Sequence, residues 1–295
     1  MAYGEAWIVR TRGLTFRALP TSRRIGALSM TPTLVRHRPH KASATSAEAG
    51  TRARDWAEIQ ERMLVPLYEA VYERLEVGTG TRLLALGCGS GLALLIARAR
   101  GATVTGVDTD SDRLGLARER MDGSPTARLV DGGPGEAGPV HPGYNLITAF
   151  QPIGCGTGDA EDLELALKDA VGLAERRSLV VLTGWGPPER CATSGVLRVA
   201  GERRRPAHRD ALEDIAARAG LNPDGSGRVA CPFGYADVDS AVRGLMSTGL
   251  YDAAVRERDH AQVEKEIAEA LHDHRRPDGT VWMPNVFRYL IARTP

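Results

Sequence analysis

Long apolar runs are missing from this 295-residue sequence, and cysteine and aromatic residues are scarce. No run approaches the roughly 20 apolar residues that a membrane-spanning helix needs, and no secretory signal stands out. The four cysteines are too scattered for a zinc site or a disulfide framework; they are Cys88, Cys155, Cys191 and Cys231. We therefore expect no membrane partner, no metal centre, and a reduced, cytoplasmic protein.

Net charge is also small, since the formal value is +1 at pH 7, and it does not favour nucleic acid as a partner. The charge is unevenly distributed, however. Residues 1–50 carry eight basic side chains against Glu5 and Glu48, a net charge of +6, and they lack helical apolar periodicity. Such a leader is compatible with a transit peptide, a phosphate-binding arm or a disordered tail, and we favour the disordered tail. Arginine strongly outnumbers lysine, which is typical of a GC-rich bacterial genome.

The most informative stretch is residues 82–108, RLLALGCGSGLALLIARARGATVTGVD. The uncharged run at 83–86 predicts a strand buried on both faces, and the glycines after it allow a sharp turn and close approach of a ligand. Ser90 can cap the helix that follows, and Asp108 ends the next strand 21 residues after Gly87. A glycine-rich turn followed by an acid at this spacing predicts a nucleoside site. An ordinary buried strand–helix–strand unit is the alternative.

The glycine spacing distinguishes between nucleoside ligands. A dinucleotide fingerprint, G-x-G-x-x-G, needs a glycine where this chain has Leu92. The pattern here is G-x-G-x-G, and with a cysteine between the first two glycines it resembles motif I of the class I S-adenosylmethionine-dependent methyltransferases. The resemblance implies that the loop cradles the amino-acid part of S-adenosylmethionine and that Asp108 binds its ribose. The loop residues implied in binding are Gly87, Cys88, Gly89 and Gly91.

One position in this motif departs from the family pattern. The family carries an acid two residues before the first glycine, where it helps orient the methionine end of the cofactor. This chain has Ala85 there. The methionine end is therefore the part of the cofactor for which the motif supplies no carboxylate.

Strand and helix patterns alternate along the chain. A helix is predicted over 55–75, kinked or divided at Pro66, ahead of the glycine-rich stretch. Further helices are expected at 111–121, 161–174, 209–219, 238–246 and 255–272, and further strands at 127–130, 144–150, 178–183, 226–231 and 285–292. This alternation predicts an α/β fold with a parallel sheet.

The resemblance extends beyond the glycine loop. The segments ARDWAEIQE, TGWGPPERC, CPFGYADVDSAVRGLMSTG, RRPDGT and NVFRYLIA are similar to bacterial small-molecule methyltransferases, so it covers about residues 53–293. It implies a doubly wound, mostly parallel, seven-stranded Rossmann-like sheet, with the last strand antiparallel beside the fifth. It also implies a methyltransferase domain at 51–295, in which a cap helix at 52–76 and a helical insertion at 235–275 form a lid over the site.

Further cofactor contacts are expected at the ends of the predicted strands. In the family, an acid that ends the third strand often accepts the adenine amino group. Asp131 is the candidate here, with a simple turn aspartate as the alternative. Phe150 and Gln151 end the fourth strand, where ligands of open α/β sheets bind, although Phe150 is also a natural core residue. Thr109 and Gly132, beside the two acids, complete the expected contacts.

Aromatic side chains are candidates for a pocket around a sulfonium cation, which aromatic faces attract. In the family, the helix that carries Trp56 crosses the mouth of the cofactor site, so we expect Trp56 to contact the cofactor. Tyr68, Trp185 and Phe233 are substrate candidates, with core packing as the alternative for each. No histidine lies in a motif that would make it a general base, so no catalytic residue is assigned.

The sequence thus predicts a methyltransferase that uses S-adenosylmethionine to methylate an oxygen, nitrogen or carbon of a small molecule in bacterial specialised metabolism. Two alternatives stay open. One is a protein that binds the cofactor but catalyses a cyclisation or rearrangement, which Ala85 motivates. The other is a nucleoside-sensing binding protein. Neither a nucleic-acid nor a membrane partner is expected, and the chain is either a monomer or a homodimer.

Overall fold

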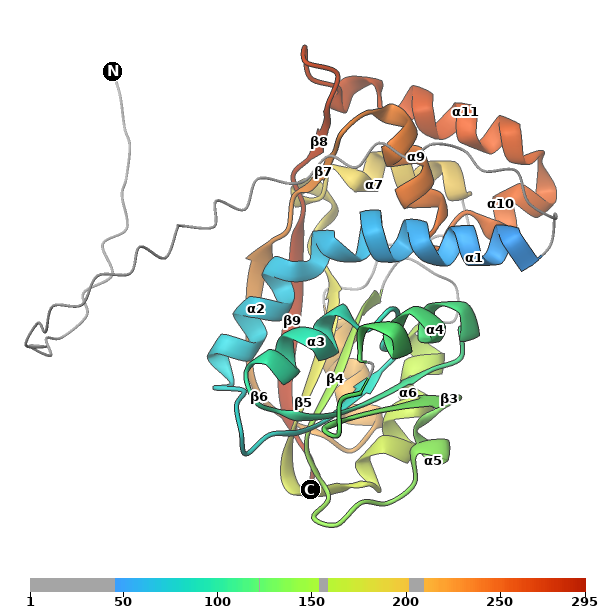
Figure 1. Ribbon diagram of the computed structural model, residues 1–295. Helices are drawn as coiled ribbons and strands as arrows, with labels where there is room; N and C mark the ends of the chain where they lie inside the picture. The colour runs from blue at the N-terminus through green and yellow to red at the C-terminus, as the bar shows by residue number, and fades with distance from the viewer. Residues whose placement is uncertain (1–45, 122, 154–158, 202–209) are drawn as a thin grey trace, which may run out of the picture. The chain divides into compact units, whose positions relative to one another are not determined.

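The computed structural model describes residues 46–121, 123–153, 159–201 and 210–295 (Figure 1). Most of the leader expected at 1–50, namely residues 1–45, lies outside the described residues. Helix α1 (Ser46–Asp55) already begins inside the expected leader. The described part of the chain therefore begins with this helix, five residues before the expected domain boundary at 51.

The N-terminal cap consists of four consecutive helical pieces. After α1 come a single π-helical turn, η1 (Trp56–Gln60), a 3-10 turn, η2 (Glu61–Leu64), and helix α2 (Val65–Arg74). Pro66 lies in the first turn of α2, where its missing N–H is tolerated. The predicted division at Pro66 is confirmed, whereas the two irregular turns before it were not predicted.

A seven-stranded sheet forms the centre of the molecule, in the order β3-β2-β1-β4-β5-β9-β6. Its strands are β1 (Arg82–Leu86), β2 (Thr103–Asp108), β3 (Ala127–Asp131), β4 (Tyr144–Ile153), β5 (Ala174–Trp185), β6 (Asn222–Ala230) and β9 (Val286–Arg293). Strand β9 runs antiparallel to both β5 and β6, and the other neighbouring pairs are parallel. The predicted doubly wound sheet, with its last strand antiparallel beside the fifth, is confirmed.

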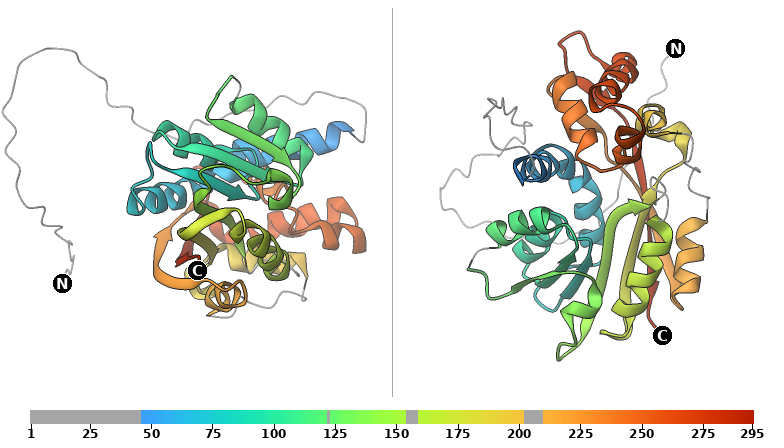
Figure 2. Two further views of the ribbon diagram at one scale, coloured as in Figure 1. Left: turned by 90° about the horizontal axis from the view of Figure 1, so that it is seen from below. Right: turned by 90° about the vertical axis from the view of Figure 1, so that its right-hand side faces the viewer.

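Helices cover both faces of the sheet, and each face has its own core. Leu83 and Ala85 of β1 pack in the cluster that includes residues of α2, α3 (Leu92–Ala99) and α4 (Ser111–Arg120). Leu84 and Leu86 pack in the other cluster, with residues of α5 (Pro134–Ala137), α6 (Asp159–Val171) and α8 (Ala211–Arg218). This alternation follows from the two-residue period of a strand. The right-hand view of Figure 2 shows the two helical layers on either side of the strands.

The remaining elements form a layer above the carboxyl ends of the parallel strands, and we refer to this layer as the lid (Figure 1). It contains the helices α7 (Thr193–Val196), α9 (Val238–Met246), α10 (Asp252–Glu257) and α11 (His260–Ala270), and the short turns η3 (Pro188–Arg190), η4 (Leu197–Ala200) and η5 (His272–His274). The expected second helix at 255–272 is divided, because the chain is extended at Arg258 and Asp259. A two-stranded ribbon of β7 (Phe233–Tyr235) and β8 (Val281–Met283) was not predicted.

Hydrogen bonds join the lid to the cap and to the sheet domain. Tyr235 Oη donates to Gln60 Oε1 at 2.9 Å, and Arg113 Nη2 donates to the carbonyl of Ser247 at 2.8 Å. The Arg113 guanidinium also lies 4.3 Å from the centre of the Trp56 ring. Cap, lid and α4 therefore meet at one place. Within the described ranges, no helix combines the length and the apolar character that crossing a bilayer requires.

Candidate functional site

The glycine loop between β1 and α3 has the backbone that its sequence requires. Gly87, Gly89 and Gly91 have φ values of +61°, +56° and +80°, in the left-handed region that favours glycine. A Cβ added at Gly87 would lie 3.1 Å from Nε2 of Gln151, and one added at Gly89 would lie 3.1 Å from Nε1 of Trp56. The loop therefore exposes bare backbone to the side chains that cover it.

The prediction that the Ser90 side chain caps the N-terminus of helix α3 is wrong. Gly91, not Ser90, is the N-cap residue, and it has no side chain with which to cap the helix. Ser90 is fully buried, and its hydroxyl donates to the Glu61 carboxylate and accepts from Nη1 of Arg120 at 2.8 Å. Through these two hydrogen bonds the Ser90 side chain joins the glycine loop to Glu61 of the cap segment and to Arg120 of α4.

Asp108 organises the end of the site where the sequence predicts a nucleoside. One oxygen, Oδ2, accepts from the backbone N–H of Gly89 at 2.6 Å, and Oδ1 accepts from the N–H of Asp110 at 2.9 Å. Asp131 pairs with Asp108 in the register of β2 and β3, and the N–H of Gly132 donates to the carbonyl of Asp108 at 2.9 Å. The predicted residues Asp108, Thr109, Asp131 and Gly132 are thus adjacent at two strand ends, with Thr109 and Asp131 exposed.

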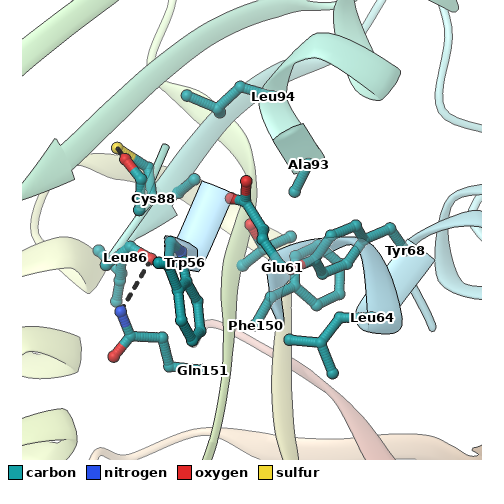
Figure 3. A pocket seen from close by; sticks show the side chains of 14 residues that line it. Trp56, Glu61, Leu64, Tyr68, Leu86, Cys88, Ala93, Leu94, Phe150 and Gln151 are labelled. Atoms are coloured by element: carbon teal, nitrogen blue, oxygen red, sulfur yellow. Dashed lines mark hydrogen bonds between the residues drawn. The ribbon is translucent and has the colours of Figure 1, made fainter. Parts of the chain in front are cut away.

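A small cavity of about 20 Å³ lies between the glycine loop and the side chains of the cap (Figure 3). Seven of the predicted site residues line it, namely Trp56, Tyr68, Gly87, Cys88, Gly89, Phe150 and Gln151. The other lining residues are Glu61, Leu64, Ala85, Leu86, Ala93, Leu94 and Thr148. A cavity of this size holds about one water molecule. The enclosed space is therefore smaller than a nucleoside, and the side chains of Trp56 and Gln151 lie over the loop beside it.

Two buried polar atoms on this cavity have no hydrogen-bond partner among the described residues. They are Nε1 of Trp56, which can only donate, and the hydroxyl oxygen of Thr148, which can donate or accept. Buried polar groups in native proteins are nearly always satisfied, so such atoms call for a ligand or water. Their position on the cavity fits a ligand that offers both an acceptor and a donor.

Glu61 is the site residue that the sequence reasoning missed. Its side chain is 3% exposed and pairs with Arg120, whose Nη1 lies 2.7 Å from Oε2. The other oxygen, Oε1, accepts from the N–H of Leu92 at 3.3 Å. A usable signal was present, because Glu61 precedes Leu64 by three residues and Tyr68 by seven. That spacing places a charged residue on the buried side of a helical segment.

The wall of the cavity toward β4 is aromatic. The ring of Phe150 lies 4.9 Å from that of Tyr68 and 5.5 Å from that of Tyr72. Burial, assisted by the nearby Glu61 carboxylate, raises the pKa of Tyr68 well above its ordinary value. Tyr68 therefore stays neutral near pH 7 and can offer a hydrogen bond, whereas removing its proton is unfavourable.

Trp185 and Phe233, predicted as substrate residues, do not line the cavity. Trp185 packs with its ring centre 5.8 Å from that of Phe233 and 4.5 Å from that of Phe287. These three side chains form an aromatic cluster where β5 and β9 meet the ribbon of β7 and β8. The surroundings of Trp185 and Phe233 are therefore those of core residues, which was the stated alternative to substrate contact.

The thiol of Cys88 packs against strand β2. A Cβ added at Gly106 of this strand would lie 2.8 Å from Cys88 Sγ. Burial and the neighbouring Asp108 raise the pKa of the Cys88 thiol. A buried thiol held in its neutral form is a poor nucleophile. Contact of Cys88 with a ligand is therefore expected through the main chain.

No histidine of the described ranges lines this cavity. His141, His260, His272 and His274 are absent from the residues that line it, and His208 lies outside the described residues. His141 precedes β4 at its amino end, opposite the carboxyl ends of the parallel strands. The general base remains unassigned.

No protein-family model matches this sequence, and no curated protein matches it significantly. The fold, in contrast, is shared with many solved structures. The YcgJ protein of Bacillus subtilis is 14% identical, with a TM-score of 0.53 over 77% of this chain and 97% of that chain. YjhP of Escherichia coli is 18% identical, with a TM-score of 0.51 over 83% of this chain and 100% of that chain.

A third solved structure is phosphoethanolamine N-methyltransferase 2 of Haemonchus contortus, in complex with phosphomonomethylethanolamine and S-adenosylhomocysteine. It is 13% identical, with a TM-score of 0.50 over 85% of this chain and 58% of that chain. At these identities the likeness establishes the fold. The chain has the fold of class I S-adenosylmethionine-dependent methyltransferases.

Proposed function

We propose that this protein binds S-adenosylmethionine and transfers its methyl group to an oxygen, nitrogen or carbon of a small molecule. One observation carries the proposal: a left-handed glycine loop whose Gly89 N–H donates to the carboxylate of Asp108 at 2.6 Å, beneath the unpaired Nε1 of Trp56 in the cap. A nucleoside attached to an amino acid matches such a site, because it needs a carboxylate for the ribose and polar groups along the loop.

The residues of the site fit this cofactor. Asp108 would accept the ribose hydroxyls, and Thr109, Asp131 and Gly132 would surround the adenine. A side chain at Gly87 or Gly89 would fill the space above the loop, since an added Cβ comes within 3.1 Å of covering side chains. The unpaired Nε1 of Trp56 supplies a donor to the same space. The glycine loop, the strand ends and the cap would therefore all contribute to the affinity for the cofactor.

The bound cofactor supplies a methyl group on a sulfonium cation. The chain itself would contribute position and exclusion of water, which can account for much of the rate of such a transfer. Phe150 and Tyr68 present aromatic surface beside the loop, suited to an adjacent cation and to an apolar acceptor. The cap and lid, joined through Gln60 and Tyr235, would close over both ligands.

Binding and turnover test the proposal separately. Calorimetry with S-adenosylmethionine and S-adenosylhomocysteine should give dissociation constants below millimolar. Incubation with S-adenosylmethionine and candidate acceptors, followed by mass spectrometry, should reveal S-adenosylhomocysteine and an acceptor heavier by one methylene unit. If neither nucleoside binds below millimolar, the cofactor assignment is wrong.

Ala85 favours a second candidate, in which the cofactor is bound but no methyl group is transferred. Its methyl side chain gives the motif no carboxylate at this position. In this case the site would promote a cyclisation or rearrangement of the small molecule. A rearranged product formed without release of S-adenosylhomocysteine would favour this second candidate over methyl transfer.

A further inference from the structure

Glu61 is the one charged residue among the fourteen described residues that line the cavity. Figure 3 shows its carboxylate between the glycine loop and the start of α3. A buried carboxylate is costly unless charged or hydrogen-bonded partners compensate it. Its place on a cavity wall, rather than inside the apolar core, is therefore a feature to explain.

The two oxygens of Glu61 have different surroundings. Oε2 accepts from Nη1 of Arg120 at 2.7 Å and from the hydroxyl of Ser90. Among the described residues, Oε1 has a single donor, the N–H of Leu92, at the long distance of 3.3 Å. A carboxylate oxygen can accept two hydrogen bonds, so Oε1 retains capacity for another donor. A Cβ added at Gly89 would lie 3.3 Å from Oε1, so this free capacity lies close to the glycine loop.

Trp56 brings a complementary donor to the same glycine. The N–H of Glu61 donates to the carbonyl of Trp56, which closes a π-helical turn and stacks the two residues along the cap. A Cβ added at Gly89 would lie 3.1 Å from Nε1 of Trp56, a donor without a partner among the described residues. An N–H donor and a carboxylate oxygen therefore converge above one glycine.

This pair matches the zwitterionic end of an α-amino acid, which offers an ammonium donor and a carboxylate acceptor. We propose that Glu61 binds the α-ammonium group of the cofactor's methionine moiety, and that Trp56 donates to its carboxylate. This inference rests on the proposed function and names the cap residues that recognise one end of the cofactor. Glu61 thus supplies, from a different element, the carboxylate that Ala85 does not provide in the glycine motif.

The test compares three ligands on the Glu61→Gln variant by calorimetry. S-adenosylhomocysteine carries both amino-acid charges and no sulfonium charge, 5′-(3-aminopropylthio)-5′-deoxyadenosine keeps the ammonium group alone, and 5′-methylthioadenosine lacks both. The first two should bind about 10- to 100-fold more weakly, since one charge-assisted hydrogen bond is lost. Affinity for 5′-methylthioadenosine should stay within about twofold. Glu58→Gln, an exposed glutamate of the same cap, is the matched control and should leave all three affinities unchanged.

Each other outcome overturns the role of Glu61. Equal weakening of all three ligands would mean that Glu61 only holds the cap in place. Unchanged affinity for S-adenosylhomocysteine, together with weaker binding of S-adenosylmethionine titrated as a fourth ligand, would assign Glu61 to the sulfonium. If the wild-type protein binds none of the ligands, the proposed function fails as well, so the two failures are distinguishable.

A second variant guards against poor folding of Glu61→Gln, which thermal denaturation would reveal. Glu61→Asp keeps the charge and the pair with Arg120 but withdraws the carboxylate by one methylene group. It should weaken the two ammonium-bearing ligands in the same selective way, by a smaller factor. If Glu61→Asp folds and shows no such selectivity, the proposal is wrong.

Discussion

The two ends of the glycine loop obtain their carboxylates in different ways. Asp108 belongs to the same strand–helix–strand unit as the loop and holds Gly89 through its backbone N–H. Glu61 comes from the cap, a separate layer, and reaches Ser90 and Leu92 only because the cap packs on α3 and α4. One end is therefore built by the local chain, and the other by packing between elements. Changes to the cap should affect the methionine end alone.

The largest expected effect concerns the packing that brings Glu61 to the loop. Arg120→Met removes the partner of Glu61 and the hydrogen bonds from Arg120 to Ser90 and to the Ala57 carbonyl. Since a buried carboxylate then loses its cation, and Arg120 is partly exposed, the free energy of unfolding should fall by about 2–4 kcal/mol. Urea denaturation measures this loss, and Arg118→Met on the exposed side of α4 is the control. In Arg120→Met/Glu61→Gln, part of the loss should be recovered; strictly additive losses would contradict the pairing.

Asp108→Ala tests the end of the glycine loop at which we propose that the ribose binds. It should weaken S-adenosylhomocysteine and 5′-methylthioadenosine equally, by about 10- to 100-fold, because both ligands share the ribose. Calorimetry gives both affinities, and the exposed Asp112→Ala is the control. Selective loss of one ligand, or unchanged affinity for both, would contradict the assignment of Asp108 to the ribose and remove the contrast with Glu61.

Gly89→Ala places a side chain where the two ends meet. The left-handed φ of +56° should cost about 1–2 kcal/mol in the free energy of unfolding. The new Cβ should also reduce affinity for S-adenosylhomocysteine, because it would lie within 3.3 Å of Glu61 Oε1. Gly123→Ala separates the two causes, since Gly123 has a φ of +67° but no atom within 4 Å of an added Cβ. Equal loss of affinity in both variants would mean that backbone strain, not occupied space, is responsible.

Trp56→Phe has the smallest expected effect. It tests whether the carboxylate and the ammonium group of the methionine moiety are bound by different residues. It removes the Nε1 donor but keeps an aromatic ring next to Arg113. Affinity for S-adenosylhomocysteine should fall about fivefold, as expected for one hydrogen bond worth about 1 kcal/mol. Affinity for the aminopropyl analogue, which lacks the carboxylate, should not change. Trp282→Phe, an exposed tryptophan stacked on Arg276, is the control. Equal weakening of both ligands would place Trp56 elsewhere on the cofactor.

Much of the sheet could be predicted because buried parallel strands and glycine turns leave local signals. The runs that form β1 and β4, and the spacing from Gly87 to Asp108, indicated both the strands and the edge where they end. Ser90 was assigned to the wrong partner, because capping rules consider a helix alone and not the Glu61 that lies against it.

Aromatic positions were predicted less well for a related reason. Sequence indicates that a large apolar side chain will be buried, but not which cavity or cluster it joins. Tyr68 and Phe150 meet at the glycine loop, whereas Trp185 and Phe233 pack with Phe287. The difference arises from the antiparallel β9 and the unpredicted ribbon of β7 and β8, which bring distant segments together.

By itself the sequence determined the parallel sheet, the left-handed glycine loop and the acid that ends β2, because each depends on residues close together along the chain. Only the tertiary structure decided that Glu61 stands beside the loop, at the end where we propose that the methionine moiety binds. Glu61 and Ser90 are 29 residues apart, and the cap bends through a π turn before reaching the loop. Their contact depends on the packing of the cap against α3 and α4, and no local pattern encodes that packing.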